Sequence, residues 1–114
     1  MKNIIENAKQ IVCIVPKGRG RQLVEAMSEE LEVYNSNFSH ARGVGRSSDV
    51  NDRGVGEQQE KDVFAVTVAQ DKADEVFEFL FYKAELDKPR NGLIYMQATP
   101  KTSIMSVPEL SSDE

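Results

Sequence analysis

The apolar positions of the chain fall into short runs that predict four β-strands. Three of these runs are rich in β-branched or other apolar residues and are too short for helices. The fourth is more polar and has Tyr34 and Phe38 among small residues. The expected strands are residues 11–15, 33–41, 63–69 and 93–98.

Between these strands, apolar residues recur every three or four positions and predict two amphipathic helices. Their apolar faces are Leu23, Val24, Met27 and Leu31 in the first helix and Ala73, Val76, Phe77, Leu80, Phe81 and Ala84 in the second. Asp71 is the expected N-cap of the second helix. The order β-α-β-β-α-β indicates an α+β fold, a ferredoxin-like sandwich in which two helices cover one face of a four-stranded antiparallel sheet. The other face then has no cover within one chain, so we expect self-association.

The length of 114 residues fits a single domain. Residues 1–9 mix charged residues with one isoleucine pair, and we expect a short N-terminal extension of about one loose helical turn. The folded domain is expected over residues 10–99, with its long loop at 43–60. Residues 100–114, which contain two prolines and end in acidic residues, are the expected C-terminal tail.

Composition excludes several classes of function. Fourteen basic against nineteen acidic residues give a net charge of −5, whereas proteins that bind nucleic acid polymers usually carry a basic excess. One cysteine and one histidine are too few for a disulfide framework or for the usual zinc site within one chain. No apolar stretch reaches the roughly 18 residues of a membrane span, and the N-terminus lacks the pattern of a signal peptide. We therefore expect a cytoplasmic protein, which also suits the free thiol of Cys13.

The segment between the second and third strands, residues 43–60, is long for a hairpin connection. The tetrapeptide Arg-Gly-Val-Gly occurs at residues 42–45 and again at 53–56, and the two copies bracket a polar stretch with few residues to pack. Glycine pairs at both ends let the backbone approach a ligand closely or swing. We expect a functional loop; the alternative is a tolerated insertion with no function of its own.

The residues Gly43-Val44-Gly45-Arg46, at the end of a strand and the start of a long loop, resemble the Gly-Phe-Gly-Arg motif that opens the T-loop of P-II signal-transduction proteins. Arg53-Gly54 resembles the Arg-Gly near the far end of that loop, and the order of elements matches from about Lys9 to Met96. The resemblance is to a divergent P-II-like subgroup. It implies a non-enzymatic homotrimer, related to regulators of nitrogen metabolism, that binds small effectors between subunits and regulates an enzyme or a transporter through its T-loop.

The resemblance and the chemistry of the loop together suggest an anion site between subunits. Glycine N–H groups approach phosphate or carboxylate oxygens closely, and arginines of the loop can meet Lys88 and Arg90 of a neighbouring subunit. The expected ligand-binding residues are Arg42, Gly43, Gly45, Arg46, Ser47, Lys88, Arg90, Asn91 and Gly92. The expected partner-binding residues are Ser48, Asp49, Val50, Asn51, Asp52, Arg53 and Gly54. An adenine nucleotide (ATP, ADP or AMP) is the candidate effector and a membrane transporter is a candidate target; no catalytic residue, metal or firmly required cofactor is expected.

The chain departs from the P-II pattern in three places. Ser47 stands where the family has a glutamine that contacts the nucleotide, and the loop has no tyrosine for control by uridylylation. Segment 86–93 keeps only Lys88 and Gly92 of the family's B-loop. The pair of arginines near the C-terminus is also missing. The effector therefore stays open, including whether ATP and 2-oxoglutarate bind.

Two other interpretations remain beside the regulator. One is a protein–protein interaction module of ferredoxin-like fold without a small-molecule ligand; the other is a small enzyme that uses His40 and Glu57. As a simpler role, His40 is structural or contacts a ligand. The stretch Gly18-Arg19-Gly20-Arg21 before the first helix is either a solvated turn or a weak anion site, and Cys13 is expected in the core.

Overall fold

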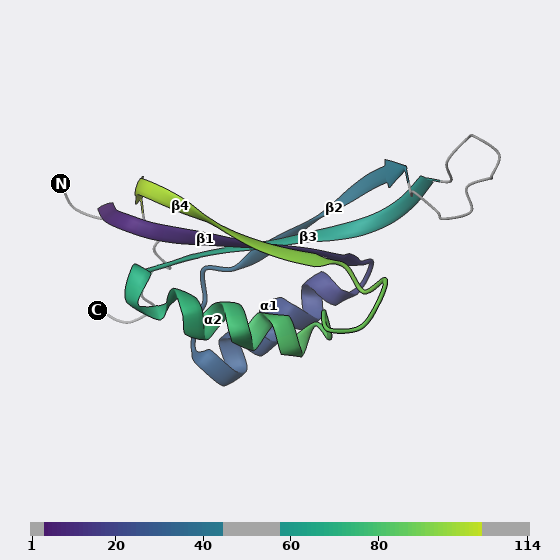
Figure 1. Cartoon of the computed structure of the whole chain (residues 1–114), viewed down its shortest axis with the longest axis horizontal. Helices are drawn as coiled ribbons and strands as arrows, with labels where there is room; N and C mark the ends of the chain where they lie inside the picture. Colours follow the sequence, from purple (N-terminus) through teal and green to yellow (C-terminus); the bar gives the residue numbers. More distant parts are fainter. Residues whose placement is uncertain (1–3, 45–57, 104–114) are drawn as a thin grey trace, which may run out of the picture.

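The computed structural model describes residues 4–44 and 58–103. Six elements follow one another along the chain (Figure 1): β1 (Ile4–Pro16), α1 (Arg19–Leu31), β2 (Asn37–Val44), β3 (Gln58–Val68), α2 (Gln70–Lys83) and β4 (Leu93–Ser103). The strands form one antiparallel sheet in the order β2-β3-β1-β4, and both helices lie on the same face of it. The predicted α+β, ferredoxin-like sandwich is confirmed.

The core lies between the sheet and the helices. Alternate residues of the central strands β1 and β3 point toward the helices, as a period of two requires. The helices meet them with residues three or four positions apart. The fully or almost fully buried core residues include Ile11, Cys13 and Val15 of β1, Phe64, Val66 and Val68 of β3, Leu23 and Met27 of α1, and Val76 and Leu80 of α2.

The opposite face of the sheet is apolar at its centre. Val12 lies between Ala65 and Tyr95 in the register, and Ile14 lies between Val63 and Leu93. Residues directly opposite each other in a sheet share a face. Leu93 is 51% exposed and Tyr95 is 42% exposed, and no described element covers them. We call Val12, Ile14, Val63, Ala65, Leu93 and Tyr95 the open sheet face.

Strands β1 and β4 are longer at one end than the sequence suggested. Residues 4–9 do not form a helical turn but continue β1, and β4 runs through Pro100 to Ser103, so the expected boundaries at residues 9 and 99 fall inside strands. Proline is tolerated there because β4 is an edge strand. Asn7, with a positive φ of 63°, stands opposite Pro100, and the ladder skips this one pair.

The hairpin of β2 and β3 shortens the predicted loop. β2 starts and ends later than expected, and β3 begins at Gln58, so Gly43 and Val44 belong to one strand while residues 58–60 belong to the other. The rest of the predicted loop, residues 45–57, lies outside the described residues. In α2 the N-cap position is Ala69, and Asp71 lies in the first helical turn, so the predicted cap was wrong by two residues.

Candidate functional site

The charged and polar residues that could form a functional site lie at one end of the sheet. Because β1 is antiparallel to both of its neighbours, its end at Pro16 lies beside the start of β3 and near the start of β4. The turn from β1 to α1, the base of the β2–β3 hairpin and the connection from α2 to β4 therefore lie at the same end (Figure 1). We call this region the loop end; it comprises residues 16–20, 40–42, 60–62 and 84–93.

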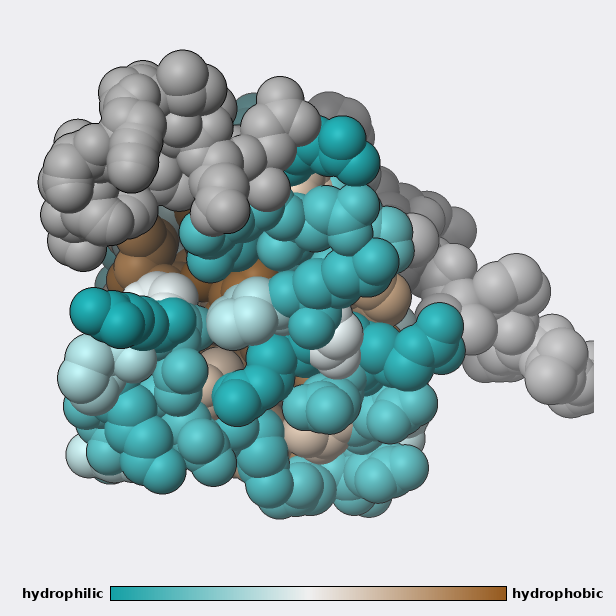
Figure 2. All heavy atoms as spheres, turned by 90° about the vertical axis from the view of Figure 1, so that its right-hand side faces the viewer, coloured by the Kyte–Doolittle hydropathy of each residue, from teal (hydrophilic) through white to brown (hydrophobic). Residues whose placement is uncertain are grey.

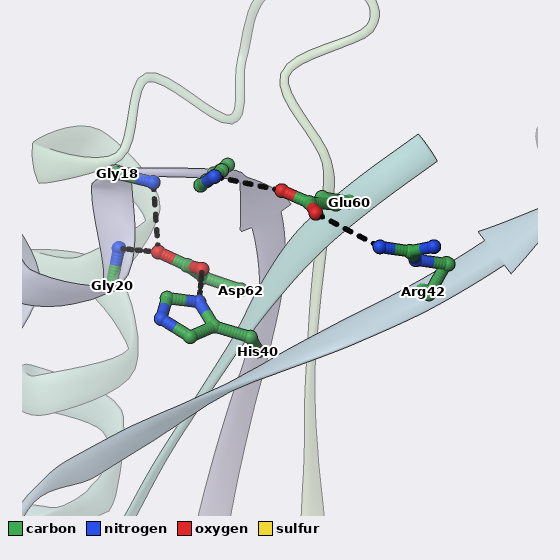
Figure 3. Close-up of polar contacts among 7 residues, drawn as sticks. Gly18, Gly20, His40, Arg42, Glu60 and Asp62 are labelled. Carbon is green, nitrogen blue, oxygen red and sulfur yellow. Dashed lines mark hydrogen bonds and ion pairs between the residues drawn. The ribbon is translucent and has the colours of Figure 1, made fainter. Parts of the chain in front are cut away.

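A buried carboxylate organises the loop end. Asp62 is 0% exposed, and its Oδ2 atom accepts hydrogen bonds from the backbone N–H groups of Gly18 and Gly20, each at 2.9 Å (Figure 3). Gly18 is the N-cap residue of α1 and has no side chain with which to cap the helix. Asp62, which comes from β3, supplies the missing negative group at the helix N-terminus. The interaction holds α1 on the sheet at this end.

Gly18 and Gly20 of this turn are required for conformational and steric reasons. Gly18 has a φ of 97°, a left-handed conformation that favours glycine. At Gly20, a Cβ atom would lie 2.7 Å from the ring of Phe38 and 2.9 Å from Oδ2 of Asp62. The close approach of the helix N-terminus to the carboxylate thus requires a residue without a side chain.

His40 forms the third hydrogen bond to the Asp62 carboxylate. Its Nδ1 atom lies 2.8 Å from Oδ1 of Asp62, while the imidazole is 65% exposed (Figure 3). An ionised carboxylate only accepts hydrogen bonds, so the assigned tautomer has the proton on Nδ1. Burial alone raises the pKa of Asp62, but the hydrogen bonds from Gly20, His40 and Gly18 outweigh it and the pKa is lowered. Asp62 is therefore an anion at neutral pH.

Glu60 forms a second, exposed cluster beside Asp62. Its Oε1 atom lies 2.7 Å from Lys17 Nζ, and its Oε2 atom lies 3.1 Å from Arg42 Nη2 (Figure 3). The hydrogen bond and the charge of Lys17, followed by those of Arg42, lower the pKa of Glu60, and Glu60 in turn raises the pKa of Lys17. Exposed ion pairs stabilise a fold little. Their consequence here is that two cations of the loop end already have an anionic partner.

The described ligand-binding candidates lie on two segments. Arg42 and Gly43 are at the base of the hairpin, and Lys88, Arg90, Asn91 and Gly92 are in the connection from α2 to β4. Within the described residues, no hydrogen bond or ion pair joins the two segments. Lys88 instead pairs with Glu85 at 3.5 Å, and the side chain of Asn91 donates to the backbone carbonyl of Glu85 at 2.9 Å.

The position of Gly92 requires glycine for a steric reason. Its φ is 122°, and a Cβ atom there would lie 2.1 Å from the carbonyl oxygen of Ile14. Gly92 therefore lets the chain enter β4 directly against β1. This explains why this glycine of the predicted ligand set is required without any ligand.

The remaining candidates lie outside the described residues. They are Gly45, Arg46 and Ser47 of the ligand set, Ser48, Asp49, Val50, Asn51, Asp52, Arg53 and Gly54 of the partner-binding set, and Glu57 of the enzyme alternative. Their roles stay predictions.

Three sequence features can now be assigned. The helix N-terminus that follows Gly18 is occupied by the chain's own Asp62, so it is not free to bind another anion, whereas Gly18 and Arg21 are exposed, as the solvated alternative expects. His40 has the structural contact that was one of its expected roles. Cys13 is buried in the core, and burial raises the pKa of its thiol to about 12.

Sequence reasoning missed the importance of Asp62, Glu60 and Lys17. One signal for Asp62 was available. In β3 the period of two that buries Phe64, Val66 and Val68 also places residue 62 on the helix-facing side, where a lone carboxylate needs donors. The Gly-x-Gly turn before α1 offers such donors, but only the tertiary fold brings them together.

The surface of the loop end is largely polar. Figure 2 views the molecule from this end, and most of the coloured surface is hydrophilic, with a hydrophobic area visible at the left. Among residues 4–44 and 58–103, no group of three or more His, Cys, Asp or Glu side chains is placed to hold a metal ion. No helix in the described part of the chain is long and apolar enough to cross a membrane.

The β-α-β-β-α-β order, the antiparallel sheet and its two helices give this chain the fold of P-II-like proteins. The crystal structure of Arabidopsis thaliana PII bound to citrate is similar with a TM-score of 0.62 and 18% identity, over 80% of this chain and 76% of that chain. CutA from Synechococcus elongatus is similar with a TM-score of 0.65 and 11% identity, over 90% of this chain and 87% of that chain. The complex of B. subtilis GlnK with ATP gives a TM-score of 0.56 and 18% identity, over 82% of this chain and 84% of that chain.

These similarities establish the fold. No protein-family model matches the chain, and no curated protein is significantly similar to it in sequence. At 11 to 18% identity the shared feature is the backbone architecture rather than a set of functional residues.

Proposed function

We propose that this chain is a non-enzymatic, trimeric, P-II-like regulator that binds a small anionic effector between subunits at the loop end. The hairpin loop between β2 and β3 then acts on a target enzyme or transporter. The observation that carries the proposal is the placement of the glycine- and arginine-rich hairpin at the same end of a P-II-like fold as the connection with Lys88 and Arg90. Effector binding would change the conformation of the loop and so its affinity for the target.

Self-association is supported by the open sheet face. Its apolar side chains, among them Leu93 and Tyr95, have no described cover within the chain. Burying such a patch against other subunits removes apolar surface from water, at about 25 cal/mol per Å². A closed ring of three subunits would also bring the hairpin of one chain near the connection from α2 to β4 of its neighbour. The folded unit would then consist of the residues expected for the domain, 10–99, together with the strand residues that extend it at both ends.

The anionic nature of the effector is supported by the side chains at the loop end. Arg42, Lys88 and Arg90 lie there, and citrate and ATP, the ligands in the PII and GlnK structures that resemble this chain, are both anions. Among adenine nucleotides, ATP, ADP and AMP remain the candidates. Because Arg42 is paired with Glu60 through Nη2, an anion that uses Arg42 binds its other N–H groups, displaces this carboxylate or adds to the cluster through Lys17.

Calorimetric titration of the assembled protein with ATP, ADP, AMP, cyclic AMP, bicarbonate and citrate tests the effector. We expect saturable binding of at least one of them, weakened about tenfold or more by Lys88→Ala, because a charge-assisted hydrogen bond contributes about 1.5–3 kcal/mol. Lys72→Ala removes the same charge from an exposed position on α2, away from the loop end, and is the matched control. Equal weakening by both variants would contradict a site at the loop end.

One observation favours a second candidate, an interaction module without a small ligand. Lys17 and Arg42 are paired with Glu60, and Lys88 is paired with Glu85, so cations of the loop end are already partly neutralised. In that case none of the small molecules binds. Deleting residues 46–53 then abolishes capture of the partner protein, whereas adding the small molecules changes nothing.

A further inference from the structure

Four large hydrophobic residues of the described chain are exposed, and they belong to two different surfaces. Leu93 and Tyr95 lie on the open sheet face, which the proposed self-association would cover. Tyr34 is 64% exposed and Tyr82 is 59% exposed, and both lie beside residues of the helices, on the other side of the sheet. The second pair is not accounted for by an assembly through the sheet.

Tyr34 and Tyr82 line two adjoining hollows in the helical layer. One, of about 510 Å³, lies between the connection that follows α1, the end of β3 and the first half of α2. The other, of about 590 Å³, runs along the second half of α2. Leu31 and Glu75 line both hollows, so they form one continuous surface, which we call the helix-layer groove. Phe79 and Val76 contribute further apolar surface to it.

The rim of the helix-layer groove is acidic. The lining contains four carboxylates, Glu32, Glu75, Glu78 and Glu85, against the two lysines Lys72 and Lys83. Glu85 is itself paired with Arg19 and Lys88. Lys83 is neutralised by Glu30, at 2.7 Å. No described residue forms an ion pair with Glu32, Glu75 or Glu78. The groove therefore combines aromatic surface with an excess of negative charge.

Within the groove, one lysine already lies over an aromatic ring. The Nζ atom of Lys83 lies 5.5 Å from the centre of the Phe79 ring, within the range of a cation–π interaction. Long basic side chains can lie along apolar surface while their charged ends reach carboxylates at the rim. Exposed tyrosines are also enriched at protein interfaces, because one edge of the ring is apolar and the other forms hydrogen bonds.

We propose that the helix-layer groove is a docking site for a basic amphipathic segment of a partner protein, separate from the hairpin loop. A helix with leucine-like residues on one face and lysine or arginine beside them fits a groove lined by apolar residues and carboxylates. Charge complementarity selects this occupant. A second copy of the chain carries the same acidic rim, and the chain's own residues 104–114 contain Glu109, Asp113 and Glu114 and no basic residue. A second copy docked groove to groove, and residues 104–114, would both bring like charges together.

The test uses a fluorescein-labelled amphipathic peptide of leucine and lysine at helical spacing, titrated with the full-length protein and followed by anisotropy. A peptide in which glutamate replaces lysine and a peptide with the sequence of residues 104–114 are the comparisons. We expect the basic peptide to bind and the other two not to bind. Amide chemical-shift changes in the wild-type protein should cluster around Tyr34 and Tyr82, and sedimentation should show no further self-association through this face. Shifts that cluster on the open sheet face, binding of either acidic peptide, or further self-association through the groove would overturn the proposal.

Matched variants separate a specific groove from general attraction to an acidic protein. The double variant Glu75→Lys with Glu78→Lys reverses charge in the groove, and Glu25→Lys with Glu29→Lys makes the same change at exposed positions of α1 that do not line it. We expect at least tenfold weaker binding for the first and less than threefold weakening for the second. Equal weakening would mean that net charge alone attracts the peptide and would overturn the proposal. Because these outcomes do not depend on any effector or on the hairpin loop, they are independent of the proposed regulatory function.

Discussion

Replacing Asp62 by alanine should strongly destabilise the protein. The substitution removes the acceptor of three hydrogen bonds, from Gly18, Gly20 and His40. Gly18 and His40 are exposed and can turn to water, whereas the N–H of Gly20 is buried and stays without a partner. A buried donor left unsatisfied costs about 1–3 kcal/mol, and hydrogen bonds to a charged group contribute about 1.5–3 kcal/mol each. We expect a loss of about 3–5 kcal/mol in the free energy of unfolding.

Two further variants separate the charge of Asp62 from its shape. Asp62→Asn keeps an oxygen for the glycine N–H groups, and its amide group can donate to His40 in the other tautomer. It should therefore cost only about 1–2 kcal/mol, the difference between charged and neutral acceptors. His40→Ala removes only the exposed partner and should cost about 1 kcal/mol.

The contribution of Asp62 to the free energy of unfolding depends on pH in a definite direction. Because folding lowers the pKa of Asp62 below its ordinary value of 3.8, the charged carboxylate stabilises the folded state fully above that value. This stabilisation is lost as the pH falls through the lower pKa of the folded state. The difference in stability between the wild type and Asp62→Asn should therefore shrink as the pH falls below 3.8.

Urea unfolding followed by far-ultraviolet circular dichroism, at one fixed protein concentration, measures these differences. The fixed concentration matters because association changes the apparent stability. A loss below about 1 kcal/mol for Asp62→Ala would refute the view that this carboxylate caps α1 through a buried bond. A difference between wild type and Asp62→Asn that does not change with pH would refute the ionised state.

The steric, assembly and reactivity arguments give three more predictions. Gly20→Ala places a Cβ atom 2.7 Å from Phe38 and should lower the unfolding free energy by about 1–3 kcal/mol in the same urea assay; an unchanged midpoint would show that the ring moves away freely. Tyr95→Glu should dissociate the assembly in sedimentation velocity, whereas Tyr82→Glu, with a similarly exposed side chain on the opposite face, should not; dissociation by both would exclude the open sheet face as the specific interface. The buried thiol of Cys13, with a pKa of about 12, should not react with a thiol reagent at pH 8 until the protein is unfolded; fast reaction of the folded protein would contradict its burial.

The sequence predicted the core of this fold well because its pattern there is strong. The short apolar runs with β-branched residues around Ile11 and Phe64 mark the two central strands, and the helical repeat that contains Leu80 marks α2. These segments are buried in the core, so their own sequence pattern shows it. Their hydrophobic period is therefore sufficient to identify them.

The outer parts of the sheet were harder to predict, because pairing rather than burial maintains them. Residues 4–9 mix charged and polar residues with one isoleucine pair and include one residue in a left-handed conformation, and they pair with residues 98–103 of β4. From the sequence, Pro100 was expected to end the last strand. An edge strand, however, accepts proline where the ladder of hydrogen bonds skips a pair. Such pairing depends on residues about 90 positions away and leaves no local pattern.

The candidate site residues stay predictions, and the sequence did not reveal the contacts of those that the structure describes. The repeat of Arg-Gly-Val-Gly marks the hairpin, but the partners of its side chains depend on register. Arg42 stands opposite Glu60 in the β2–β3 ladder, and this pairing, rather than composition, decides that it is in an ion pair. The cap supplied by Asp62 to a helix more than 40 residues earlier is likewise a product of the tertiary fold.

The most direct test of a P-II-like regulator is a crystal structure of the full chain grown with an adenine nucleotide, ATP, ADP or AMP. The proposed function predicts three chains associated through their open sheet faces, with the nucleotide between the hairpin of one chain and the segment from Lys88 to Gly92 of its neighbour. An assembly that leaves Leu93 and Tyr95 exposed, or a nucleotide bound away from the loop end, would contradict it.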